Sequence, residues 1–197
     1  ISNESITKRA EKIGFVLQNP NAMISKVTVF DEVALGLQTR GISPDEIDKR
    51  VLEILEICKL KPFRNWPIKA LSYGQKKRVT IASVLILQPE IIIVDEPTAG
   101  QDFKGMKILH DLIDELQKRG KTIVTITHDM EFVVNNFERV IVMTNGEIIA
   151  DGDKRDIFWE LETLEKSMVK QPYISDLARE LGMNEKVLSI EDFVEKF

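Results

Sequence analysis

Two adjacent carboxylates, Asp95 and Glu96, directly follow four consecutive β-branched residues at 91–94. Such a run is typical of a strand buried on both faces, and ligands of open α/β sheets bind outside the carboxyl ends of the strands. Gly100 allows a tight turn that brings Asp102 back near this edge. One acid could hold the water shell of Mg²⁺ and the next could activate a water. The pattern favours nucleotide hydrolysis, with solvated acids at an ordinary strand end as the alternative.

A second candidate site lies in the segment 71–75. Ser72 is suited to cap the N-terminus of a helix, and free backbone N–H groups at 73–75 would attract an anion. Gly74 would let the backbone approach a phosphate closely, and three basic residues follow at 76–78. The pattern predicts phosphate contact through Ser72, Gly74 and Gln75, with an ordinary capped helix as the alternative.

Two further polar side chains come at the ends of predicted strands. Gln18 follows an apolar strand at 13–17, and His128 follows a second buried strand at 122–127. The amide of a glutamine could reach a metal or the attacking water, and a histidine could donate a hydrogen bond to phosphate or water. Taken alone, each is equally compatible with a plain polar strand end.

Hydrophobic periodicity predicts the elements that must position these residues. Helices are expected at 27–37, 44–58, 72–87, 104–119, 156–168, 174–181 and 189–197, and a hairpin at 139–150 turns at Asn145-Gly146. The segment around 27–87 reads as a helical insertion. The sequence therefore predicts an α/β fold with a parallel sheet, a helical insertion and a small, mainly helical C-terminal tail.

Net charge, cysteine content and the length of apolar runs limit the kinds of partner and of structure that this sequence is compatible with. The 197 residues carry a formal net charge of -5, which argues against a nucleic-acid backbone as the main partner. A single cysteine, Cys58, excludes a disulfide framework and is expected to be a small buried hydrophobe. No stretch approaches the ~18 apolar residues that a membrane-spanning helix needs.

In order and spacing, the motifs resemble the ATP-binding-cassette (ABC) family of ATPases. The matching residues are Leu71-Ser72-Tyr73-Gly74-Gln75, the basic helix after them, Asp95-Glu96-Pro97-Thr98 at a strand end, and Gly100-Gln101-Asp102. Tyr73 stands where the commonest signature has Gly, and Gln101 stands where Leu is usual. The resemblance implies ATP and Mg²⁺ as cofactors.

The resemblance also implies a role for each site residue. Ser72 and Gly74, with Gln75, would contact the γ-phosphate of ATP held by an opposite subunit. The remaining assignments are Asp95 as the Walker B acid and Mg²⁺ ligand, Glu96 as the catalytic base, Gln18 as the Q-loop glutamine that also reaches the metal, Asp102 as the D-loop aspartate and His128 as the switch histidine.

The family binds phosphate chiefly through a Gly-x-x-x-x-Gly-Lys-Ser/Thr loop, and no such motif occurs in these residues. In the family this loop lies upstream of the Q-loop, on a strand between those at 122–127 and 139–143. We expect residues 1–152 to form a partial P-loop NTPase core of the ABC type and 153–197 to form a helical extension. The chain alone is expected to be inactive as an ATPase.

The tail resembles those on ATPases of energy-coupling-factor transporters. This implies an ATP-hydrolysing subunit of a membrane importer for a vitamin or a metal ion such as cobalt, cytoplasmic and peripheral on the inner face of the cell membrane. The expected partners are a second ATPase subunit, identical or different, and integral membrane subunits, without nucleic acid. The alternatives are a soluble ABC ATPase of DNA repair or translation and a non-enzymatic binding module. From Gln18 to Leu71 the gap of 53 positions (71 − 18) fits a compact insertion better than the long coiled coil of repair-type members.

Overall fold

The computed structural model describes residues 4–196 and divides into two compact units, Ile1–Ile126 and Thr127–Phe197. The expected division at residue 152 separates the ATPase core from the helical extension, and it stays a prediction. Among the residues that the structure describes, no helix is long and apolar enough to cross a membrane.

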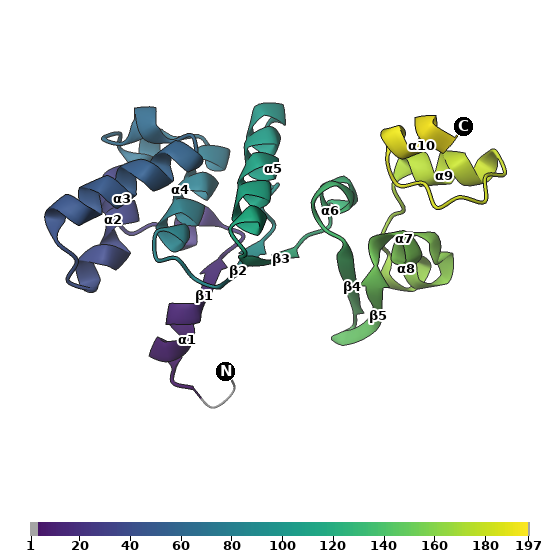
Figure 1. Ribbon diagram of the computed structural model, residues 1–197, viewed down its shortest axis with the longest axis horizontal. Coiled ribbons are helices and arrows are strands. Elements are labelled where there is room, and N and C mark those ends of the chain that lie inside the picture. Colours follow the sequence, from purple (N-terminus) through teal and green to yellow (C-terminus); the bar gives the residue numbers. More distant parts are fainter. Residues whose placement is uncertain (1–3, 197) are drawn as a thin grey trace. The chain divides into compact units, whose positions relative to one another are not determined.

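The first unit is a three-stranded parallel sheet with helices, as the sequence predicts. Its elements are α1 (Ile6–Lys12), β1 (Ile13–Val16), α2 (Val29–Thr39), α3 (Pro44–Ile57), α4 (Tyr73–Leu85), β2 (Ile91–Asp95), α5 (Phe103–Lys118) and β3 (Thr122–Ile126), with 3₁₀ turns at Pro20–Ala22, Lys61–Phe63 and Ile68–Ala70. The strand order is β1-β2-β3, so the acid-bearing strand is central (Figure 1). The register pairs Val16 with Val94 and Asp95 with Ile126, which brings the carboxyl ends of the three strands to one edge.

The two faces of this sheet differ in burial. Ile92 and Val94 are buried, but Ile91 and Ile93 on the opposite face of β2 are only half-buried. On that opposite face the neighbouring Val124 of β3 is 45% exposed. The expectation that this strand is buried on both faces is therefore wrong, because the side chains on its second face are only partly covered.

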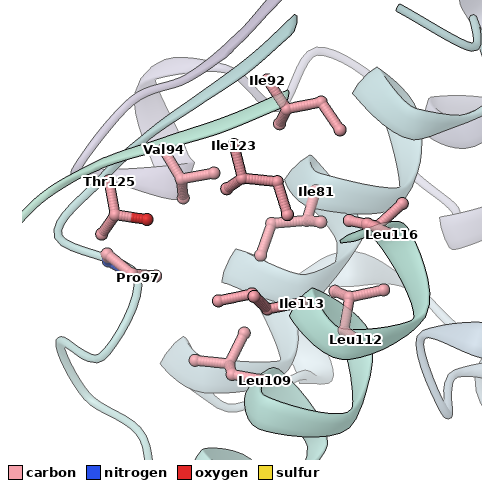
Figure 2. A pocket seen from close by; sticks show the side chains of 10 residues that line it. All are labelled: Ile81, Ile92, Val94, Pro97, Leu109, Leu112, Ile113, Leu116, Ile123 and Thr125. Carbon is pink, nitrogen blue, oxygen red and sulfur yellow. The ribbon is translucent and has the colours of Figure 1, made fainter. Parts of the chain in front are cut away.

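The buried face of the sheet packs on α4 and α5. Figure 2 shows Ile92, Val94 and Ile123 of the sheet turned toward Ile81 of α4 and Leu112 of α5. A small cavity of about 20 Å³ remains between these layers. Leu112 belongs to the amphipathic stripe that the sequence predicts for 104–119, and the helix ends, as expected, just before a glycine with positive φ.

The helical insertion is also present. α2 and α3 bury their apolar faces and pack on each other and on α4, with Val33, Leu37, Val51 and Leu55 at most 1% exposed. The free thiol of Cys58 is buried at the end of α3, as expected for a small hydrophobe.

The second unit contains a hairpin and five short helices within its described residues. These elements are α6 (Met130–Asn136), β4 (Arg139–Thr144), β5 (Glu147–Asp153), α7 (Lys154–Trp159), α8 (Leu161–Ser167), α9 (Tyr173–Glu180) and α10 (Ile190–Lys196). Asn145 and Gly146 both have positive φ, 51° and 82°, the conformation expected for this hairpin turn. β4 pairs only with β5 among the described strands, and β3 belongs to the other sheet.

One helix of the tail differs from the sequence expectation. The segment 156–168 forms two helices, α7 and α8, because the chain breaks at Glu160, whose ψ of 85° is not helical. The break lets Phe158 and Leu164 both enter a core with Val134 and Leu188. A continuous helix would place residues 158 and 164 on different faces.

Candidate functional site

Gln18 and Asp95 lie at neighbouring strand ends and share a hydrogen-bond donor. The Nζ of Lys77 in α4 donates to the carbonyl oxygen of Gln18 at 3.0 Å and to that of Asp95 at 2.6 Å. The backbones of these two predicted site residues are therefore held together. Gln18 is exposed, and Asp95 is half-buried.

Glu96 adopts a backbone conformation that is uncommon for its residue type. Its φ is 44°, in the left-handed region, and its N–H donates to the carbonyl oxygen of Ile126 at 2.8 Å. A non-glycine residue in this region costs on the order of 1 kcal/mol, and such strain clusters at functional sites. The conformation ends β2 abruptly beside the end of β3 and half-buries the residue predicted as the catalytic base.

Ser72 caps α4 as predicted, and the cap is a reciprocal capping box. The N–H of Gln75 donates to Ser72 Oγ at 3.2 Å, and the N–H of Ser72 donates to Gln75 Oε1 at 2.9 Å. The expectation of a free N–H at Gln75 is therefore wrong, because the cap uses this donor. The Ser72 hydroxyl remains exposed and can still donate its own hydrogen.

Position 74 requires glycine because residues 100–101, in the segment that follows β2, lie very close to it. A Cβ at Gly74 would come within 2.7 Å of Gln101 Oε1 and 3.0 Å of the Gly100 carbonyl oxygen. Gln101 also donates from Nε2 to the Gly74 carbonyl oxygen at 3.3 Å. The glycine thus brings the tip of α4 against residues 100–101, in addition to any phosphate contact.

Asp102 caps the next helix. Its Oδ1 accepts a hydrogen bond of 2.7 Å from the N–H of Gly105, in the first turn of α5. Two helix N-termini, those of α4 and α5, therefore flank one hollow of about 710 Å³. All four residues predicted to contact nucleotide line it, namely Ser72, Gly74, Gln75 and Asp102.

The hollow has a basic wall. Lys59, Lys104 and Lys107 line it together with Arg78, whose side chain donates to the Cys58 carbonyl oxygen at 3.0 Å. Arg78 is only 8% exposed, and its burial lowers the pKa of the guanidinium. Basic side chains beside two helix N-termini suit an anionic ligand.

Lys77 is the important residue that the sequence patterns missed. Its side chain is fully buried, and a third bond of 2.7 Å runs from Nζ to the Leu17 carbonyl oxygen. Burial lowers the pKa of Lys77 to about 8, while the charges of Asp95 and Glu96 oppose that shift. Helical spacing could have found it, because Lys77 lies four residues before the buried Ile81 and so on the same inward face.

His128 follows β3 by two residues and is the second residue of the second unit, which begins at Thr127. It is exposed and lies directly before Asp129, which caps α6 by accepting from the N–H of Phe132. Because His128 and the carboxylates belong to different units, its role as a switch stays a prediction. Within residues 4–196, no three His, Cys, Asp or Glu side chains form a group that could hold a metal ion.

Sequence and structure comparisons agree on one family. The family model described as ABC transporter matches residues 1–99, half of the chain. A relative from Streptococcus agalactiae serotype V, named as a proposed ABC transporter ATP-binding protein, is 53% identical over 96% of this chain. One from Clostridium perfringens with the same description is 48% identical over the whole chain. The chain spans only 34% of the length of each of these relatives.

Two solved structures resemble the fold. CbiO1 from Clostridium perfringens, described as part of the ABC transporter complex CbiONQ, is 37% identical with a TM-score of 0.73, over 88% of this chain and 70% of that one. The dimeric ATP-binding cassette MJ0796, bound to ADP and phosphate, is 34% identical with a TM-score of 0.68, over 77% of this chain and 68% of that one. With half of the chain matched by the family model, this α/β chain belongs to the ABC transporter family.

Proposed function

We propose that this chain provides the signature and hydrolytic parts of an ATPase subunit in an ABC importer of the energy-coupling-factor type, for a vitamin or a metal ion such as cobalt. The observation that carries the ATPase assignment is the basic hollow between α4 and α5, which Ser72, Gly74, Gln75 and Asp102 line together. The likeness to CbiO1, part of an ABC transporter complex, supports the importer type.

The proposed chemistry divides between two nucleotides. Ser72 and Gly74 contact the γ-phosphate of ATP held by a partner subunit, with Gln75 securing the cap beneath them. Glu96 accepts the proton of the water that attacks this chain's own nucleotide, and Gln18 and His128 orient that water and the phosphate. Asp102 fixes the start of α5 beside the partner's nucleotide.

Mg²⁺ fits the donors at the ends of β1 and β2. The Asp95 carboxylate and the Gln18 amide oxygen are hard ligands, and Mg²⁺ is usually held by one or two protein groups together with phosphate oxygens. The chemistry that Mg²⁺ supplies when bound is neutralisation of phosphate charge. The sequence lacks a Gly-rich phosphate loop, so we expect hydrolysis only where such a loop completes the site.

The proposed assembly is a pair of ATPase subunits on membrane partners. MJ0796 is described as dimeric and CbiO1 as part of a transporter complex, which supports a second ATPase subunit and integral membrane subunits here. In such an assembly the protein would be a peripheral, cytoplasmic subunit at the inner face of the cell membrane. Residues 1–152 would serve as the ATPase core and 153–197 as an extension for assembly.

Glu96→Gln in the intact ATPase tests the catalytic assignment. General-base catalysis contributes about 10² to 10⁴ in rate, so ATP turnover should fall by this factor while ATP binding persists and the ATP-bound dimer accumulates. Glu90→Gln, an exposed acid just before the same strand, is the matched control and should keep full turnover. Normal turnover in Glu96→Gln would remove Glu96 from the role of base.

Capture of partners and cobalt uptake test the importer assignment. Affinity purification of the intact protein from membranes should recover a hydrophobic membrane subunit, and Glu96→Gln should abolish ATP-dependent uptake of cobalt or of a vitamin. Recovery of ribosomes or DNA would favour a soluble ATPase of translation or repair, which the names of the relatives disfavour. An intact protein that binds partners but never hydrolyses ATP would be a binding module.

A further inference from the structure

The first turns of α4 form a joint with the ends of two strands. Lys77 has three N–H donors, and all three are used by carbonyl oxygens, of Leu17 at 2.7 Å, Gln18 at 3.0 Å and Asp95 at 2.6 Å. A buried cation is costly unless it is fully hydrogen-bonded. The joint therefore tolerates little relative movement between α4 and the ends of β1 and β2.

Tyr73, one of the two departures from the usual family pattern, strengthens this joint. Its hydroxyl donates to the Gln18 carbonyl oxygen at 3.2 Å. Its ring lies on Gly100, where an added Cβ would come within 2.5 Å of ring carbon Cδ1. A glycine at position 73 could make neither contact, so Tyr73 adds a link between the tip of α4, the Gln18 segment and the turn at residue 100.

Gln101, the second departure, closes the same network. Its side-chain amide donates to the Gly74 carbonyl oxygen, a hydrogen bond that leucine cannot make. The tip of α4 that carries Ser72 is therefore tied to residues 17–18, to residue 95 and to residues 100–101.

We propose that Lys77 and Tyr73 are positioning residues of the ATPase, which couple the tip of α4 to Gln18 and to the Asp95–Glu96 end of β2. The inference rests on the proposed function, in which Ser72 meets the partner's nucleotide while Gln18 and Glu96 serve the chain's own. Through this joint, engagement of Ser72 fixes the hydrolytic residues of the same chain. The two nucleotide sites are thereby linked within one subunit.

Two substitutions remove different numbers of hydrogen bonds from the joint, and a third serves as a control. Lys77→Met keeps the length and apolar stem of the side chain and removes all three donors. Tyr73→Phe removes a single hydroxyl from a side chain that is 39% exposed, so the fold is retained even if Lys77→Met fails to fold. Lys69→Met, at an exposed lysine shortly before α4, is the matched control.

The first readout is steady-state ATP hydrolysis by the intact ATPase. Misplacement of reacting groups by about 1 Å costs up to about 10²-fold in rate, so kcat should fall at least about tenfold in Lys77→Met and about threefold in Tyr73→Phe. The KM for ATP should stay within about twofold of the unmodified value, because neither residue binds the chain's own nucleotide. Lys69→Met should match the unmodified enzyme.

The second readout is amide hydrogen exchange on this chain without nucleotide. Both variants should speed exchange at residues 17–19 and 95–99, more strongly in Lys77→Met, and leave α3 unchanged. Exchange unchanged in Tyr73→Phe and in any folded Lys77→Met would overturn the coupling itself. Faster exchange with a normal kcat per folded molecule would overturn the positioning role. Absence of ATPase activity in the unmodified intact protein would instead overturn the proposed function.

Discussion

At the scale of single residues, the hydroxyl oxygen of the half-buried Thr125 is buried at a cost to stability. Of the ten residues that line the cavity between the sheet and α5, it is the polar one, and its Oγ1 is buried without a hydrogen-bond partner (Figure 2). An unpaired buried hydroxyl costs about 1 to 3 kcal/mol, whereas valine has nearly the same shape. Thr125→Val should raise the free energy of unfolding of the first unit by about 1 kcal/mol.

Urea denaturation followed by tryptophan fluorescence measures this change. Thr122→Val on the same strand is the control, because that threonine is exposed and its hydroxyl is solvated. The control should alter stability by less than about 0.5 kcal/mol. A destabilised Thr125→Val variant would show that the hydroxyl is satisfied in solution.

Single-residue roles could be predicted where the signal is local. Ser72 and the following helical residues identify a cap, and the β-branched run before Asp95 identifies a strand end, since each depends on a few consecutive residues. Lys77 could not be assigned its contacts in this way. Its three acceptors lie 18 to 60 positions away, and only the folded chain brings them to one ammonium.

At the scale of elements, most helices and strands could be predicted because their apolar spacing is regular. The hairpin turn at Asn145-Gly146 and the helix 103–118 before Gly120 follow local rules closely. The division of 156–168 at Glu160 could not be predicted, because both halves have helical composition. Packing around Phe158 and Leu164 decides it.

The last helix is joined to α7 by a bidentate ion pair. Two guanidinium nitrogens of Arg155 contact the Asp192 carboxylate at 2.7 and 3.0 Å, and these bonds lower the pKa of Asp192. Because the pKa of Asp192 is lower in the folded chain than in the unfolded chain, the ion pair stabilises the fold fully at pH values above the ordinary aspartate pKa of about 4. This stabilisation is lost as the pH falls through the pKa that Asp192 has in the folded chain. Asp192→Asn should therefore destabilise the second unit by about 1 kcal/mol at pH 7 and less below pH 4.

The measurement is thermal unfolding of the second unit between pH 3 and pH 7, followed by Trp159 fluorescence. Asp176→Asn in α9 serves as the control, because Asp176 is exposed. Its unfolding temperature should follow that of the unmodified chain at every pH. An equal deficit of Asp192→Asn at pH 3 and pH 7 would contradict a role for the charged pair.

At the scale of the whole molecule, the five strands within residues 4–196 form two sheets, β1-β2-β3 and β4-β5. The sequence predicts each strand, and the family resemblance implies a further strand between those at 122–127 and 139–143. Hydrophobic periodicity could not predict the pairing of the strands, because it indicates that a segment is a strand but not which other strand it pairs with. Each unit has buried apolar residues of its own, such as Leu55 and Ile92 in the first and Phe158 and Leu188 in the second.

Because each unit has a core of its own, we expect the two units to unfold separately, and the fluorescence of the two tryptophans can measure this. Trp66 packs edge-on against Phe63 in the first unit, and Trp159 donates to the Val187 carbonyl oxygen in the second. Trp159→Phe leaves a reporter of the first unit only, and Trp66→Phe leaves one of the second. Urea titrations of the two variants should give transitions with different midpoints, because cooperativity requires shared packing.

A destabilising substitution in each unit tests whether the two units unfold independently. Val51→Ala, at a fully buried position of α3, should cost about 2 kcal/mol and lower the Trp66 midpoint while leaving the Trp159 midpoint in place. Asp192→Asn should lower the Trp159 midpoint and leave the Trp66 midpoint in place. If either substitution moved both midpoints equally, the chain would unfold as one cooperative body, which would contradict independent unfolding of the two units.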